Sequence, residues 1–186
     1  IRAAGDGRLP VPGWTGEYEW EGYIPFEELP HMFNPAPGYI ATANNRIADN
    51  GYPYHLSSDY VGPGRISRIH ELIQSADKID PATIQRMHVD QVSIFARKTA
   101  QALRLLTSED PELQIILRHL SAWDGNLSAD SCEAAIYEAF VQRLAFRLLE
   151  PRLGELAAHY IGKGITPVLS EQSMLGERCM EWIVQL

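Results

Sequence analysis

Three polar side chains follow the short apolar run 38–43: the amides of Asn44 and Asn45 and the guanidinium of Arg46. A side-chain amide without a hydrogen-bond partner in an apolar setting costs about 1–3 kcal/mol, so amides that end a buried strand are expected to have a partner. That partner is either a ligand, to which the amide NH2 donates, or the backbone of a turn. From the residues alone the turn is the commoner role, and both interpretations stay open.

The segment that must position these side chains is predicted to be a β-strand over 38–44. It is too short for an independent helix and carries aromatic and β-branched residues. Residues 45–63 are predicted to form a long connection, which is more often functional than idle. Asp49-Asn50-Gly51 within it favours a turn, because Asn and Gly accept positive φ. Apolar residues at helical spacing then predict a helix over 65–75.

From Asp80 onward the sequence is predicted to be helical. The pairs Asp80-Pro81 and Asp110-Pro111 each place an N-cap residue before a proline at the first helical position. After the first pair, one continuous apolar stripe predicts a single long helix that reaches Leu106. After the second pair, the predicted helix ends at 124–126.

A third helix is predicted over 131–149, with Asp130 and Glu133 as its capping box. Pro151 and the glycines that follow it predict a less regular chain. A last helix is expected to begin near Ser170 and to continue to the end of the sequence.

The residues before the predicted strand are rich in proline, glycine and aromatic side chains, which disfavours helix. A single turn is expected at Phe26–Leu29, closed by Pro30. We therefore divide the sequence into two parts of one domain. Residues 1–78 are a loop-rich segment with the strand, and residues 79–186 are a mainly helical part.

Composition excludes several classes of protein. The 186 residues are 45% hydrophobic and carry a net charge of −8, which is globular and argues against a nucleic-acid-binding protein. No apolar run approaches 18 residues, so no membrane span is expected. The sequence opens on Ile1 and closes on the apolar run 181–186, and we expect both ends to be breaks in a longer polypeptide.

Cysteine and histidine residues show no ligand pattern. Cys132 and Cys179 lie far apart without metal-binding spacing, and two separate core thiols are the favoured interpretation. The six histidines are scattered and are expected to have structural or surface roles. His55 is left without an assigned role.

Three segments, in order, give the sequence a resemblance to the penicillin acylase family of N-terminal-nucleophile amidohydrolases. In that family a strand ends on an Asn-Asn pair, a Tyr-Pro follows, and an Arg opens the next helix. The three segments are Gly7–Pro30, Gly38–Arg68, and Trp123–Gly125 with the long helix after it. The resemblance implies an α+β fold class: a fragment of the αββα sandwich, with a loop and strand part before a helical part.

The resemblance also implies a mechanism. Family members use the first residue of a processed chain, a Ser, Thr or Cys, as the nucleophile, with its own α-amine as the base. Ile1 cannot serve, so the nucleophile, an N-terminal Ser, is expected upstream. Asn44 resembles the Asn whose NH2 stabilises the oxyanion of the tetrahedral intermediate. Arg65 resembles the Arg that orients this Asn and the substrate, with Arg68 as the competing position.

A structural calcium ion is a further implication, since oxygen ligands suit Ca²⁺. Asp59 matches the family carboxylate that follows the Tyr-Pro, and the Gly7 carbonyl matches the ligand before Arg8-Leu9-Pro10. The remaining ligands would lie upstream, and Asp59 as a solvated acid or turn cap is the alternative. No organic cofactor is expected.

The resulting prediction is an internal part of the β chain of an amidohydrolase that cleaves N-acyl amides through an acyl-enzyme. Penicillin-type compounds and acyl-homoserine lactones are the substrate classes implied. Partners would be the α chain and the rest of the β chain of the same self-cleaving precursor, exported to the periplasm or secreted. The alternative is a catalytically inactive helical scaffold or interaction module, formed by residues 80–186.

Overall fold

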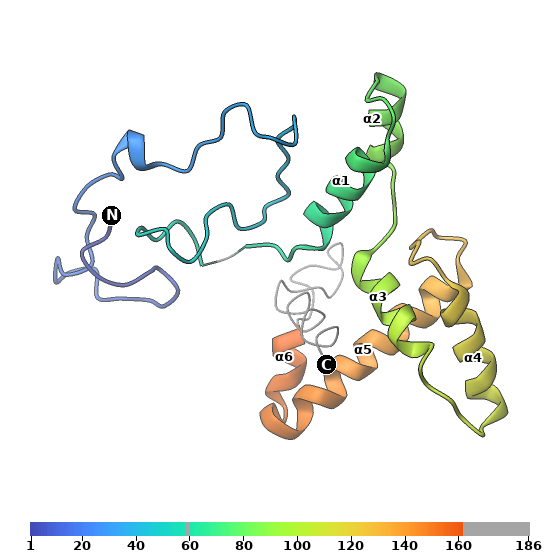
Figure 1. Ribbon diagram of the computed structural model, residues 1–186. Helices are drawn as coiled ribbons and strands as arrows, with labels where there is room; N and C mark the ends of the chain where they lie inside the picture. Colours follow the sequence, from blue (N-terminus) through green and yellow to red (C-terminus); the bar gives the residue numbers. More distant parts are fainter. Residues whose placement is uncertain (59, 162–186) are drawn as a thin grey trace. The chain divides into compact units, whose positions relative to one another are not determined.

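The computed structural model describes residues 1–58 and 60–161 (Figure 1). Contacts divide the chain into two compact units, which we name the first unit, Ile1–Val61, and the second unit, which begins at Gly62. The contact boundary lies at residue 62, and the first helix after it begins at Gly64. The division into parts 1–78 and 79–186 of one domain stays a prediction. The helix expected from Ser170 lies outside the described residues.

The first unit is almost entirely irregular chain (Figure 1, blue to blue-green). The expected single turn is confirmed as the 3-10 helix η1, Phe26–Glu28. An isolated antiparallel bridge joins Arg2 to Trp20, and the Arg2 guanidinium lies 4.6 Å from the centroid of the Trp20 ring. The many prolines and glycines explain the lack of regular structure: prolines restrict φ and withhold N–H donors, and glycines lose the most conformational entropy when they are ordered.

The strand predicted over 38–44 is not formed, and this prediction is wrong. A strand exists only by pairing with a neighbour, and no segment of residues 1–58 pairs with this one in a ladder. Ala43 is buried at 5% exposure, but Ile40 before it is 63% exposed. The αββα sandwich stays a prediction, since residues 1–58 and 60–161 contain helices and isolated bridges only.

Large apolar side chains of the first unit are mostly exposed to solvent. Ala43 is the one residue of its described part that counts as buried. Four aromatic side chains of its described part are more than four-fifths exposed: Trp14, Tyr23, Phe26 and Phe33. The first unit thus has very little hydrophobic core of its own.

Residues 62–161 of the second unit, apart from connecting segments, are helical and contain a buried core. Its described helices are α1 Gly64–Ser75, α2 Pro81–His88, α3 Ile94–Leu103, α4 Pro111–Ala122, α5 Cys132–Leu153 and α6 Leu156–Ile161. Small residues on α3 allow α4 to pack closely against it, and α5 contributes side chains to the same buried cluster. The rings of Trp123 and Tyr137 lie 5.3 Å apart in this core. The buried cluster consists of Ala96, Ala100, Leu103, Leu120, Trp123, Ala134, Tyr137 and Val141.

Two helix starts follow their predicted caps. Asp80 accepts a hydrogen bond from the Thr83 backbone N–H at 2.9 Å, and α2 begins on the next residue. Asp110 accepts from the Glu112 N–H at 2.9 Å and opens α4 in the same way. Such caps are worth about 1 kcal/mol each, so local chemistry alone defines these boundaries.

The single long helix predicted after Asp80 is wrong, because the chain breaks between α2 and α3. Ser93 caps α3 by accepting from the Ala96 N–H at 3.2 Å. Before it, Val92 forms an isolated bridge with Asn126. The apolar stripe continues through the segment between α2 and α3. The backbone of that segment is nevertheless not helical, because it forms hydrogen bonds with residues 125–127, far away in the sequence.

Helix α5 differs from its prediction at both ends. Ser131, not Asp130, is the N-cap, and it accepts from the Ala134 N–H at 3.0 Å. Pro151 lies inside the helix, which continues until Gly154 ends it with φ 54°. Cys132, expected to be a core thiol, is exposed at the first position of α5. Cys179 lies outside the described residues.

Candidate functional site

Asn44, the predicted oxyanion donor, has a left-handed backbone with φ 59°. Asn is among the few residues that adopt this conformation without a large penalty. Its carbonyl accepts a hydrogen bond from the Val61 N–H at 2.9 Å, which closes the intervening chain into a loop. The residue is exposed to solvent. We name residues 44–61 the amide loop.

Asn45, the second amide, has the turn role that its residue type suggested. Its Oδ1 accepts from the Ala43 N–H at 3.0 Å, and its Nδ2 donates to the Arg46 carbonyl at 2.9 Å. Arg46 then donates to Asn50 Oδ1 at 2.5 Å and to the Asp49 carbonyl at 3.1 Å. Asn45 and Arg46 therefore shape the amide loop, and the predicted turn at Asp49-Asn50-Gly51 is part of the same hydrogen-bonded set.

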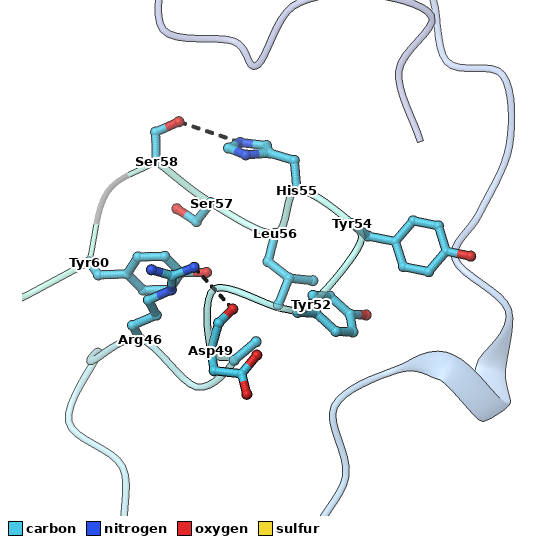
Figure 2. A pocket seen from close by; sticks show the side chains of 10 residues that line it. Arg46, Asp49, Tyr52, Tyr54, His55, Leu56, Ser57, Ser58 and Tyr60 are labelled. Atoms are coloured by element: carbon cyan, nitrogen blue, oxygen red, sulfur yellow. Dashed lines mark hydrogen bonds between the residues drawn. The ribbon is translucent and has the colours of Figure 1, made fainter.

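The amide loop surrounds a small pocket (Figure 2). Its volume is about 270 Å³, and charged, aromatic and hydroxyl side chains line it. Figure 2 shows the His55 ring turned toward Ser58, whose hydroxyl lies 3.4 Å from His55 Nε2. The lining includes Arg46, Asp49, Tyr52, His55, Ser58 and Tyr60.

Two tyrosines of the amide loop are hydrogen-bonded to Glu28 of η1. Tyr52 donates its hydroxyl to the Glu28 carbonyl at 2.9 Å, and Tyr54 donates to Glu28 Oε2 at 2.5 Å. The hydrogen bond to this carboxylate raises the pKa of the Tyr54 phenol. Sequence reasoning missed this contact, and only the Tyr-Pro-Tyr motif pointed to the segment. The tyrosines link the amide loop to a segment more than twenty residues earlier.

Arg65 and Arg68, the two candidate arginines, have different surroundings in α1. Arg65 is the second residue of the helix and is exposed. Arg68 donates through Nε and a terminal NH2 to the two oxygens of Asp90, at 2.8 and 2.7 Å. Its other terminal nitrogen donates to Glu71 at 3.1 Å. The three nitrogens of Arg68 are thus all engaged by carboxylates of the second unit.

Four charged side chains form an interaction that we name the α1 ion cluster: Arg68, Glu71, Asp90 and Arg97. Arg97 donates to Glu71 Oε1 at 2.5 Å and so joins α3 to α1. The hydrogen bonds from Arg68 lower the pKa of Asp90. Burial alone would raise the pKa of Glu71, but hydrogen bonds from Arg97 and Arg68 outweigh it and lower that pKa. Both acids are therefore held ionised at neutral pH.

The two residues predicted to bind calcium are only partly described. Asp59 lies outside the described residues, and Gly7 has φ 81° beside the guanidinium of Arg2. The nearby carboxylate of Asp6 accepts a hydrogen bond from Arg8 Nε at 2.5 Å. Within residues 1–58 and 60–161, no three His, Cys, Asp or Glu side chains gather closely enough to hold a metal ion.

The structure therefore describes the predicted site residues one by one. Asn44 belongs to the first unit and Arg65 to the second, and each has been described within its own unit. Asn44 offers a side-chain amide, a donor and acceptor of hydrogen bonds, on a closed loop. Arg65 offers a planar guanidinium cation at the start of a helix. None of the described helices is long and apolar enough to span a lipid bilayer.

Comparison with known proteins assigns the class. The family model for penicillin amidase matches residues 1–184, and the chain belongs to that family. It is 36% identical over 167 residues to the acyl-homoserine lactone acylase QuiP of Pseudomonas fluorescens Pf0-1, a match covering 82% of this chain and 20% of the relative.

Other relatives agree on the family. The chain is 35% identical over 174 residues to the penicillin acylase 2 proenzyme of Pseudomonas sp. SE83, covering 91% of this chain and 22% of that protein. It is 35% identical over 131 residues to penicillin G acylase of Escherichia coli, a match that covers 64% of this chain and 15% of that protein. The chain thus spans about a fifth of the length of the first two relatives.

Proposed function

We propose that this chain is part of an amidohydrolase that cleaves N-acyl amides into a carboxylic acid and an amine. The observation that carries the proposal is the family match over residues 1–184, which includes the Asn-Asn segment. In the proposed reaction, the hydroxyl of an N-terminal Ser outside this sequence attacks the amide carbonyl, the C–N bond breaks, and the amine leaves with the hydroxyl proton, which gives an acyl-enzyme. Water then releases the acid and restores the hydroxyl.

In this proposal Asn44 donates its side-chain NH2 to the oxyanion of the tetrahedral intermediate. A fixed donor of this kind is worth about 3–4 kcal/mol of transition-state stabilisation. Two features support Asn44 over its neighbour. The bond from the Val61 N–H holds its backbone, and the side chain of Asn45 is already committed to the turn.

Arg65 is the proposed orienting arginine. What supports it over Arg68 is the engagement of all three Arg68 nitrogens by Asp90 and Glu71. Three of the five guanidinium N–H groups of Arg68 donate to these carboxylates, which explains Arg68 as a structural residue of the second unit. The exposed position of Arg65 at the start of α1 suits a residue that acts outside its own helix.

The proposed substrates are N-acyl amides of the penicillin type or the acyl-homoserine lactone type, after the names of the relatives. The proposed partners are the α chain and the rest of the β chain of one precursor, and the name of one relative as a proenzyme supports processing. Export to the periplasm or secretion belongs to the same proposal. Structural calcium on Asp59 and the Gly7 carbonyl is also proposed, although the Arg2 guanidinium beside Gly7 opposes a second cation there.

To test the proposal, a chromogenic phenylacetyl amide or long-chain acyl amide is incubated with the full-length protein from which this sequence derives, and hydrolysis is measured. We expect release of the amine and, by mass spectrometry after rapid quenching, an acyl adduct on the N-terminal Ser of the β chain. A correctly folded and processed protein that hydrolyses neither substrate class would contradict the proposal. The scaffold alternative would then be favoured, since the α3–α5 core is complete within residues 94–153.

A further inference from the structure

Within the second unit, helix α1 is joined to the chain after α2 by a contact between two charged groups of opposite sign. Arg68 and Asp90 form a bidentate pair, with side-chain exposures of 21% and 17%. Such a pair fixes orientation as well as distance, because two parallel hydrogen bonds define a plane. Exposed ion pairs are usually worth little, but this pair is largely removed from water and belongs to a network.

The acid of this pair lies on a firmly held segment. Directly after Asp90, the Gln91 carbonyl accepts from the Leu127 N–H at 3.0 Å, and the Ser93 N–H donates to the Gly125 carbonyl at 2.9 Å. These two bonds flank the isolated bridge between Val92 and Asn126. Asp90 is therefore a fixed point of the second unit.

Packing and a second ion pair hold α1 in the same place. A Cβ built on Gly64 would lie 2.7 Å from Phe95 Cε2, so the start of α1 lies directly against α3. Arg97 of α3 pairs with Glu71, one turn beyond Arg68. Three contacts along one side of α1 thus determine both its rotation and its position along its axis.

Arg65 precedes Arg68 by three residues, so the two are neighbours on the helix surface. Any rotation or shift of α1 that breaks the pair with Asp90 also moves Arg65. From this geometry, and resting on the proposed function of Arg65, we propose that Asp90 is a positioning residue that acts on the reaction through α1 and Arg65. It touches neither substrate nor nucleophile in this proposal.

The test is a double-mutant cycle in the full-length protein, with kcat and KM measured for a chromogenic acyl amide. Asp90→Asn keeps the shape of the side chain but removes its charge, and we expect it to lower kcat about tenfold with little change in KM. In an Arg65→Ala background the same substitution is expected to change kcat less than about twofold, because its target is gone. Asp90→Glu should restore part of the rate.

Asp77→Asn is the matched control, since Asp77 is an exposed acid just beyond the end of α1. It should leave kcat unchanged in both backgrounds. If Asp90→Asn costs the same factor with and without Arg65, or costs nothing, the positioning role is overturned.

Hydrogen–deuterium exchange gives a readout that does not need activity. Asp90→Asn should speed exchange of the amides of 64–75 about tenfold or more, while those of 132–148 stay as slow as before. Unchanged exchange in α1 would overturn the inference. If the unsubstituted protein hydrolyses no acyl amide, the proposed function fails, and the exchange experiment alone then decides whether Asp90 holds α1.

Discussion

Gly125 approaches Arg97 so closely that a Cβ built on the glycine would lie 2.8 Å from the Arg97 backbone nitrogen. The same glycine has φ 84° and accepts a hydrogen bond from the Ser93 N–H. The Trp-Asp-Gly motif is therefore more than the end of α4. It places the chain after α4 directly against the first turn of α3, where a side chain of any size would not fit.

Gly125→Ala is expected to destabilise the protein by about 2–4 kcal/mol, from positive φ together with the backbone clash. Urea unfolding followed by circular dichroism measures it. Gly154→Ala is the matched control, since Gly154 also has positive φ but has open space at the Cβ position. Its backbone, at φ 54° and ψ −132°, is also one that L residues rarely adopt, so Gly154→Ala should cost about 1–3 kcal/mol from backbone strain alone, less than Gly125→Ala. Equal losses for the two variants would show that the close approach to Arg97 is unimportant.

Asn44→Ala in the full-length protein is expected to lower kcat by about 10²–10³ with KM little changed, because the lost donor acts in the transition state. Steady-state kinetics on a chromogenic acyl amide measures both constants. Asn45→Ala serves as the comparison, and it should cost about 1 kcal/mol of stability by removing the acceptor of the Ala43 N–H. A normal kcat in Asn44→Ala would remove the oxyanion assignment.

Replacing each α1 arginine by lysine separates their roles. Arg65→Lys should lower kcat/KM about tenfold or more, because a lysine cannot make bidentate contacts. Arg68→Lys should instead lower stability by about 1–2 kcal/mol, between the values for exposed and buried pairs. Thermal unfolding and kinetics on both variants distinguish the two. The reverse result, with Arg68 the kinetic residue, would exchange the assignments.

The Arg68–Asp90 pair predicts a dependence of stability on pH. Because folding lowers the pKa of Asp90, the unfolded state binds this proton more readily. The contribution of the pair is complete at neutral pH and is lost as the pH falls below about 4, through the lowered pKa of the folded state. Asp90→Asn should flatten the acid side of the stability curve, whereas Asp77→Asn should not. Parallel curves for both variants would contradict this.

Calcium can be tested on the purified full-length protein. If Asp59 and the Gly7 carbonyl belong to a calcium site, EDTA should lower the melting temperature, and added Ca²⁺ but not Mg²⁺ should restore it. Native mass spectrometry should show one calcium lost with the chelator. Asp59→Asn should abolish both effects. A protein that melts at the same temperature with and without EDTA has no structural calcium.

Helix starts were predictable where the signal is local. Asp80 and Asp110 cap their helices with their own carboxylates, so a few adjacent residues contain all the information. The same reasoning chose the wrong cap for α5, because Asp130 and Ser131 are both acceptable and adjacent. Where two adjacent residues can both serve as the N-cap, the start of the helix can be assigned only from the backbone geometry.

The break between α2 and α3 was not predictable, because its causes lie far away in the sequence. Asp90 accepts hydrogen bonds from Arg68, and Val92 forms a bridge with Asn126; each partner is more than twenty residues away in the sequence. The strand over 38–44 failed for a related reason: a strand needs a partner, and a hydrophobic pattern does not identify one. The segment of Asn44 was found through its residue types, but the contact of Tyr52 and Tyr54 with Glu28 was not.

The exposed aromatic side chains of the first unit have a consequence for expression. If residues 1–61 were produced alone, the side chains of Trp14, Tyr23 and Phe33 would expose apolar surface to water. Such a polypeptide is expected to bind the dye ANS, to associate with chaperones and to precipitate at micromolar concentration. A polypeptide that begins at residue 62, whose described helices bury Leu120 and Trp123, should remain in solution under the same conditions.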